Sequence, residues 1–400
     1  MTVSQFLRGA SCAVAVVLLS FILLGRVPGV GAQGDKPVEQ TRKNIQVLKG
    51  LPDSQLLPLM NLISTSLGVR CDFCHVIEGD GPDRWKMERD DKPEKLTARK
   101  MMQMTIALNK GNPDLFGANG VTCYTCHGGH EHPASLPTLP ITESAHEGPP
   151  RPAAGAATGA QPGGAPAGAA RPTPPTAEQI LNRYVEGVGG RAAVAKVGTL
   201  VLKGTREASQ GRSWPVEISV KGTDKYLIVA TVPQQGEQRQ GMTGGKGWAR
   251  GPRGQRELSP AEMKILREGV LYSTPLKIAE PFPAMQFRGQ RKVGDRDAYV
   301  LGYEPSPGVR KRLYFDKQTG LLLREQTFTD TMISPIPEQV DYEDYRDIGG
   351  GVMMPFTVRY SSVDTFFSFT RKLTEVRPNV ALDDSIFNPP PPAPAATPKP

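Results

Sequence analysis

The sequence predicts a multidomain protein in which an all-α domain is followed by a domain of antiparallel β-sheet that opens with one helix. Apolar residues recur at helical spacing in the first third of the chain, whereas short runs of period two, separated by Gly, Pro and Asp turns, occupy the last half. Between them, residues 134–175 are rich in Pro, Ala, Gly and Thr. Such a composition buries too little apolar surface to offset the entropy cost of ordering, so we expect a disordered linker there.

The first 32 residues predict an export signal. Arg8 precedes the apolar run Cys12–Leu24, and the small residues before position 33 fit a signal-peptidase site after Ala32. The run is shorter than the ~20 residues of a membrane-spanning helix, although Arg26 leaves an uncleaved N-terminal anchor as the alternative. We therefore expect a periplasmic or cell-envelope protein.

Residues 35–133 are expected to form the all-α domain. One helix begins at Asp53, whose side chain can cap it, and stops at Gly68. A second helix starts behind Pro93 and ends near Gly111. Its buried stripe is predicted at helical spacing through Ala98, Met101, Met104, Thr105 and Leu108.

A Cys-x-x-Cys-His pentapeptide follows each of these two helices. The pentapeptides span Cys71–His75 and Cys123–His127 and hold four of the five cysteines. Two thiols one helical turn apart can bond to the two vinyl groups of a haem, and the adjacent histidine can supply one axial ligand to the iron. The sequence therefore predicts two covalently attached c-type haems, bound through Cys71, Cys74, His75, Cys123, Cys126 and His127.

Two other chemistries use paired cysteines. A Cys-x-x-Cys pair alone can be a redox disulfide or half of a zinc site, and four cysteines can make one tetrahedral metal centre. Neither needs a histidine after both pairs, and the gap of about 50 residues between the pairs is long against the ~15–20 of common zinc spacings.

A six-coordinate haem needs a second axial ligand, and methionine sulfur is one choice. Met60 lies on the helix before the first motif, and it is the methionine nearest to that motif. Met101 lies on the helix before the second motif, with Met104, Met102 or a histidine as alternatives. Methionines at helical spacing also serve as core packing, which is the competing interpretation.

Three segments resemble the photosynthetic reaction-centre cytochrome c subunit family: Leu67–Val76, Ala98–Met104 and Val121–Gly129. The resemblance implies a helix bearing the axial Met, a loop and a helix opened by Cys-x-x-Cys-His. It places Met60 and His75 on one iron, and Met101 and His127 on the other. Those subunits carry four haems and commonly an Arg where this chain has Gly128, so the resemblance favours electron transfer more than light capture.

Residues 176–389 are expected to form the β-sheet domain. Thr176 and Gln179 are spaced as a capping box for the opening helix, which Gly189 and Gly190 close. A meandering antiparallel sheet is predicted from the runs Thr199–Leu202, Val216–Val220, Tyr226–Val229, Ala298–Tyr303, Arg312–Phe315, Leu321–Thr327, Phe356–Tyr360 and Phe366–Leu373. The tail at 390–400 is expected to be disordered.

Several segments of this domain resemble the lipoprotein-carrier and sorting-protein superfamily: Ile180–Tyr184, Gly189-Gly190, Gly247-Trp248, Leu313–Leu322, Tyr342–Arg346 and Met354–Phe356. The resemblance implies a strongly curved half-barrel whose concave side is closed by helices and can hold an acyl chain. The Asp316–Gly320 part of the match is equally explained as a hairpin turn.

These features predict an exported dihaem cytochrome c that passes single electrons between redox proteins, with a membrane-bound electron-transfer complex among its partners. No catalytic constellation is found, so no enzyme is expected. The net charge of +8 forms no basic stripe, and nucleic acid is not an expected partner. The β domain would contact lipid or a docking partner, on a linker that lets it move independently. Alternatives are a periplasmic lipid carrier with accessory haems, and a haem peroxidase or sensor with one open iron site.

Overall fold

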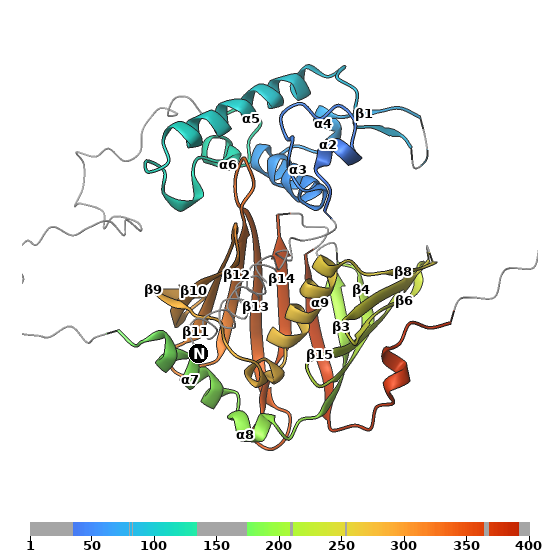
Figure 1. The fold of residues 1–400 in the computed structure, drawn as a ribbon, viewed down its shortest axis with the longest axis vertical. Helices are drawn as coiled ribbons and strands as arrows, with labels where there is room; N and C mark the ends of the chain where they lie inside the picture. The colour runs from blue at the N-terminus through green and yellow to red at the C-terminus, as the bar shows by residue number, and fades with distance from the viewer. Residues whose placement is uncertain are drawn as a thin grey trace, which may run out of the picture.

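The chain was analysed as a computed structural model, which describes residues 35–79, 81, 83–133, 174–208, 211–252, 254–363 and 368–391. The expected signal peptide lies outside the described residues, as do nearly all of the linker and most of the C-terminal tail. The described residues form a smaller helical part and a larger β-sheet part (Figure 1).

The helical part contains two long helices and several short elements: α2 (Val38–Thr41), α3 (Asp53–Leu67), α4 (Cys71–Cys74), β1 (Val76–Ile77), β2 (Trp85–Lys86), α5 (Pro93–Gly111), η1 (Gly117–Asn119) and α6 (Cys123–His127). Strands β1 and β2 pair antiparallel directly after the first motif. The expectation of an all-α domain is therefore not confirmed, because this small hairpin interrupts the helices.

Helix α3 begins where the sequence predicted but is capped differently. Its N-cap is Pro52, and Asp53 makes no capping hydrogen bond. The Asp53 carboxylate instead accepts hydrogen bonds from Arg42 at 2.8 Å and Thr41 at 2.6 Å, which ties the N-terminal segment to the helix. The helix stops at Gly68, which takes the left-handed conformation with φ +67°.

The larger part is a sheet of 13 strands, and every neighbouring pair is antiparallel. The strand order is β8-β7-β6-β5-β4-β3-β15-β14-β13-β12-β11-β10-β9. Strands consecutive in sequence are therefore neighbours except for β8 and β9, which form the two edges, and β3 and β15 are the neighbours that are distant in sequence. The sheet curves around a helix on its concave side (Figure 1). The predicted curved antiparallel sheet is confirmed.

The strands are β3 (Thr199–Ala208), β4 (Ser213–Lys221), β5 (Lys225–Val232), β6 (Gly236–Thr243), β7 (Lys246–Gly251), β8 (Gly254–Glu257), β9 (Gln286–Val293), β10 (Arg296–Ser306), β11 (Val309–Asp316), β12 (Leu322–Thr329), β13 (Ile336–Asp347), β14 (Met353–Ser362) and β15 (Phe369–Pro378). The helical segments of this part are α7 (Ala177–Gly187), α8 (Arg191–Val194), α9 (Pro260–Tyr272), η2 (Pro275–Ala279) and η3 (Asp384–Phe387).

Helices close the concave face of the sheet. Thr176 and Gln179 form the predicted capping box of α7, and Ile180 and Tyr184 of this helix are buried in the main core. Helix α9 was not predicted from the sequence; it is capped by Ser259 and packs Leu271 into the same core. The main core of this part therefore lies between the sheet and these helices.

The two parts share a second hydrophobic core. Ile333 lies in the turn after β12, and Ile336 is the first residue of β13. They are 2% and 6% exposed and cluster with apolar residues of the helical part, namely Val38, Leu51 and Leu59. The Thr65 hydroxyl also donates to the Val363 carbonyl oxygen at 3.0 Å. In Figure 1 the β12–β13 turn reaches the helices. The structure thus joins the two parts through apolar contacts and a hydrogen bond.

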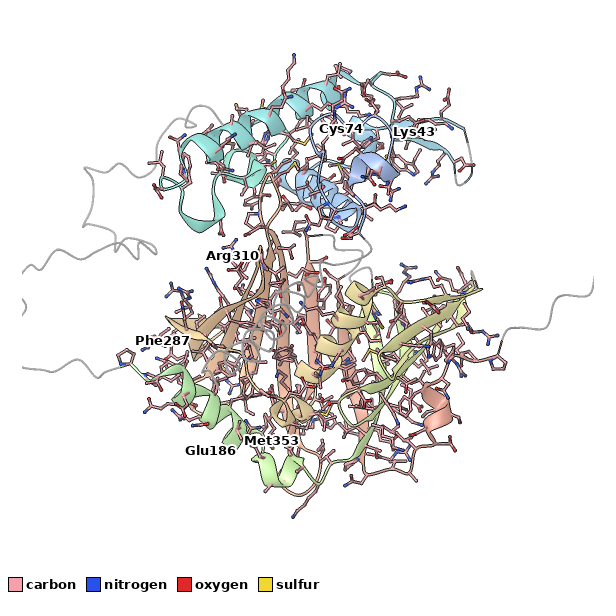
Figure 2. All side chains as sticks on the ribbon, in the orientation of Figure 1. Lys43, Cys74, Glu186, Phe287, Arg310 and Met353 are labelled. Carbon is pink, nitrogen blue, oxygen red and sulfur yellow. The ribbon has the colours of Figure 1, made fainter. Side chains whose placement is uncertain are left out.

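A polar contact lies beside this shared core. The Arg310 guanidinium donates to the Asn119 side-chain oxygen at 3.3 Å and to Asp330 at 2.7 Å. Figure 2 places Arg310 at the edge of the sheet that faces the helices. The segment that leads into the second Cys-x-x-Cys-His motif therefore makes both apolar and polar contacts with the β-sheet part.

Candidate functional site

The first motif forms the single-turn helix α4, with His75 as its C-cap residue. Residues three apart lie on the same side of such a turn, so Cys71 and Cys74 are neighbours. Both are free thiols, and burial raises the pKa of Cys74 above its ordinary value. Burial thus favours the neutral thiol at Cys74.

Beside this helix lies a cavity of about 590 Å³. That volume falls within the range of ~300–1,000 Å³ typical of cofactor pockets. Both cysteines and His75 line it, and Cys74 and Lys43 of its lining are labelled in Figure 2. The apolar part of the lining includes Leu56, Leu57, Met60, Ile63, Leu67, Trp85, Met87 and Met102. The charged part comes from Arg42, Lys43, Arg70, Lys95 and Arg99, with Asp53 and Glu88.

His75 is held in the form that binds metals. Burial, followed by the positive charge of Lys95, lowers the pKa of its imidazole, which favours the neutral ring. Its Nδ1 atom is buried and makes no hydrogen bond of ordinary geometry to the described residues. A buried polar atom without a partner is rare in folded proteins. The unpartnered ring nitrogen therefore makes His75 a candidate ligand residue.

Three methionines line this cavity, and one of them, Met87, lies in the segment after β2. Met60 comes from α3, as predicted, and Met102 comes from α5. The predicted stripe on α5 placed Met101 and Met104 on the buried side, but these side chains are 43% and 50% exposed. The buried face of α5 includes Thr105, as predicted, with Met102 and Ile106 in place of Met101 and Met104.

An ionic network at the cavity rim was not predicted. The Asp90 carboxylate pairs with Arg99 at 2.8 Å and with Lys95 at 3.0 Å, and the Arg99 hydrogen bond is the main cause that lowers the pKa of Asp90. Lys95 Nζ also donates to the carbonyl oxygens of Met87 and Arg89. Both cations therefore keep fixed positions beside His75.

The second motif forms α6, which is capped by Thr122 through a capping box with Thr125. Burial raises the pKa of Cys123, and Cys126 is exposed. His127 Nδ1 lies 3.0 Å from the His130 carbonyl oxygen. Because a carbonyl oxygen only accepts hydrogen bonds, Nδ1 carries the proton and the Nε2 lone pair is free for a metal.

The two motifs are joined through backbone atoms. Gly129 N donates to the Ser66 carbonyl oxygen at 2.9 Å, beside the left-handed Gly68 that ends α3. A Cβ added to Gly68 would lie 2.1 Å from the Gly129 carbonyl oxygen. This glycine is required for the close approach of the two motifs.

Replacing Gly68 by Ala should therefore destabilise the protein more than the same change at Gly79. Both positions have positive φ, but a Cβ at Gly79 would meet no atom within 4 Å. We expect the backbone clash to add about 1–3 kcal/mol to the cost at Gly68, as measured by urea unfolding of both variants. Equal losses would mean that the two motifs separate easily.

The donor set fits a c-type haem at the first site. The cavity offers two thiols, an imidazole, thioether sulfur and an apolar lining, with cations placed to receive carboxylates. Among the described residues, no three His, Cys, Asp or Glu side chains gather into a group that could hold a metal ion. The four cysteines thus remain in two separate pairs.

These donors and this lining are those of a c-type cytochrome. Residues 25–155 match the family model of the photosynthetic reaction centre cytochrome C subunit. The subunit of Thermochromatium tepidum is 32% identical over 109 residues, which cover 27% of this chain and 25% of that protein. Cytochrome c-554 of Chloroflexus aurantiacus is 33% identical over 88 residues, 21% of this chain and 20% of that protein. The chain thus spans about a quarter or less of these curated relatives.

Solved structures similar to this chain match its C-terminal part. A LolA superfamily protein from Nitrosomonas europaea has a TM-score of 0.36 and 16% identity, over 54% of this chain and 99% of that chain. A DUF1329 family protein from Desulfovibrio piger has a TM-score of 0.38 and 15% identity, over 53% and 96%. Within the described ranges, the structure has no helix of the length and apolarity needed to cross a membrane.

Proposed function

We propose that the protein is an exported carrier of single electrons with two covalently bound c-type haems. The observation that carries this proposal is the first cavity, which brings Cys71, Cys74, His75 and a methionine together. When bound, each haem supplies an iron that changes oxidation state by one electron while its ligands stay in place. The protein residues hold, orient and shield that group.

At the first site, we assign thioether attachment to Cys71 and Cys74 and axial ligation to His75 and Met60. The apolar lining excludes water, which disfavours a net charge on the iron and so tunes the potential. Lys43 and Arg70 at the cavity are positioned to pair with haem carboxylates, whereas Arg42 is held by Asp53.

At the second site, Cys123 and Cys126 attach the haem and His127 supplies one axial ligand. The hydrogen bond from His127 Nδ1 to the His130 carbonyl oxygen fixes the ring and makes Nε2 a better donor. The second axial ligand is Met101, or Met104 on the same helix. Their exposed side chains are free to turn toward a bound group.

The proposed location is the periplasm or cell envelope, after export by the signal peptide at residues 1–32. The partners would be redox proteins, with a membrane-bound electron-transfer complex among them, as the names of the matched relatives suggest. The β-sheet part would act as a docking or lipid-facing module, held against the helical part by their shared core.

Counting haems in motif variants tests this proposal. The full chain, expressed with a haem-attachment system, should retain two haems per polypeptide after denaturation and acid-acetone extraction. Replacing Cys71 and Cys74 by Ser should leave one haem, and so should the same change at Cys123 and Cys126. Intact mass measures each count. Full-length protein that retains no haem would refute the proposal. A zinc site or a disulfide would then be the better interpretation of the paired cysteines.

A further inference from the structure

Two arginines face each other on the concave side of the sheet. Arg371 of β15 is paired directly with Arg206 of β3. Alternate residues of a strand share a face, so Arg206 lies on the same side as Leu202, and Arg371 on the same side as Leu373, and both leucines belong to the main core. The two guanidinium groups therefore project into the interior of the curve.

Neither arginine has an acidic partner among the described residues. The Nε atoms of both are buried and form no hydrogen bond. Burial lowers the pKa of Arg371 to about 10, and the positive charge of Arg206 also lowers it. Burial is the sole cause that lowers the pKa of Arg206. Like charges on directly opposite residues of neighbouring strands destabilise a sheet, and unpaired buried charges cost more.

The neighbouring charges in the sheet are compensated. On the same concave face, Lys311 pairs with Glu325 at 2.6 Å and with Glu268 at 2.8 Å. On the opposite face, adjacent to the arginines in sequence, Lys372 pairs with Glu207 at 2.9 Å. The paired arginines are thus a local excess of positive charge in a sheet that otherwise places acids beside its buried cation.

Aromatic rings orient the Arg206 side chain. The Arg206 guanidinium lies 3.9 Å from the centroid of Phe369 and 5.9 Å from that of Trp214, and Tyr360 stacks on Phe369 at 5.4 Å. Stacking fixes the guanidinium plane and leaves its N–H edge free for an acceptor. The Arg206 guanidinium is therefore oriented before any ligand binds.

We propose that Arg206 and Arg371 form a binding site for an anionic group, a carboxylate or a phosphate, on the concave face of the sheet. Two guanidinium groups match the paired oxygens of such an anion through bidentate hydrogen bonds. The adjacent rings of Trp214, Phe369 and Tyr360 offer apolar surface beside the anion. The ligand is either a free anion or the head group of an amphiphile, and this site is independent of haem binding.

The test uses the full-length protein with its haems and calorimetric titration against three probes: inorganic phosphate, acetate and the fatty-acid anion oleate. We expect at least one probe to bind. Replacing both Arg206 and Arg371 by Met should weaken that binding about tenfold or more. Lys372→Met is the matched control, because it removes one positive charge from the adjacent residue on the opposite face, and it should bind as the wild type does.

Each outcome decides the proposal. Binding of phosphate or acetate indicates a free-anion site, and binding of oleate alone indicates an amphiphile head group. If the double variant does not fold, Arg371→Lys replaces it, since it keeps the charge but loses the planar fork, and its affinity should fall. Absence of binding by all three probes, or unchanged affinity in the variants, would mean that the arginines serve only to pack against Phe369.

Discussion

Replacing Met60 by Ala is expected to abolish the sulfur-to-iron charge-transfer band of one haem and to lower the reduction potential of that haem. Thioether ligation favours ferrous iron, and axial ligands set haem potentials over a range of ~0.8 V. Loss of the Met60 sulfur should therefore shift the potential by on the order of tenths of a volt. Spectra of the oxidised protein and a redox titration measure both effects.

Met102→Ala is the matched control for this experiment. Met102 presents the same thioether group to the same cavity, but from α5 instead of α3. If it only packs against the core, its removal should leave the charge-transfer band in place. If the band is lost in Met102→Ala but stays in Met60→Ala, Met102 is the axial ligand and Met60 of α3 serves only as core packing.

The location of Met102 explains why the ligand choice was difficult from sequence. Helix α5 was predicted with nearly its observed bounds, because Pro93 and Gly111 mark its ends. Burial of Thr105 was predicted correctly but burial of Met101 and Met104 was not. Methionines occur at 101, 102 and 104, and neighbouring registers of the helical period fit them almost equally. The packing of α5 against residues distant in sequence selects Met102, and a single helix does not encode that choice.

The β-sheet part was likewise predicted only in part from the sequence. Strands rich in apolar residues, such as β3 and β11, were predicted. Strand β6 (Gly236–Thr243) was missed because its Glu, Gln and Arg side chains hide the period of two. Helix α9 carried a readable signal that was overlooked: Ser259, then Pro at the first helical position, then Glu262 completing a capping box. The two Cys-x-x-Cys-His motifs could be recognised in the sequence because covalent haem attachment needs its cysteines and histidine close together in the chain.

The contact between the two parts has no local signal at all. Ile333 and Ile336 flank a turn that reads as an ordinary hairpin connection, yet they are buried against Val38 and Leu59, nearly 300 residues earlier in the chain. Cys123 of the second motif also packs against this shared core. The β-sheet part therefore supports one of the proposed haem sites directly.

Replacing Ile333 by Ala should accordingly destabilise the helical part, although the residue belongs to the β-sheet part. Truncating a fully buried isoleucine costs about 2–5 kcal/mol through lost transfer free energy and the cavity left behind. Met332, the preceding residue, is 36% exposed, and Met332→Ala should change stability by less than ~0.5 kcal/mol. Haem absorbance and far-ultraviolet circular dichroism, recorded during urea unfolding, report the two parts separately.

The comparison of the two signals decides how the parts are coupled. If the shared core joins them, both transitions coincide in the wild type, and in Ile333→Ala the haem transition moves to lower urea. A haem transition that stays in place while only the dichroism transition shifts would show that the turn stabilises the sheet alone. The β-sheet part would then be a tethered neighbour of the cytochrome, and its contact with Cys123 would have no energetic consequence for haem retention.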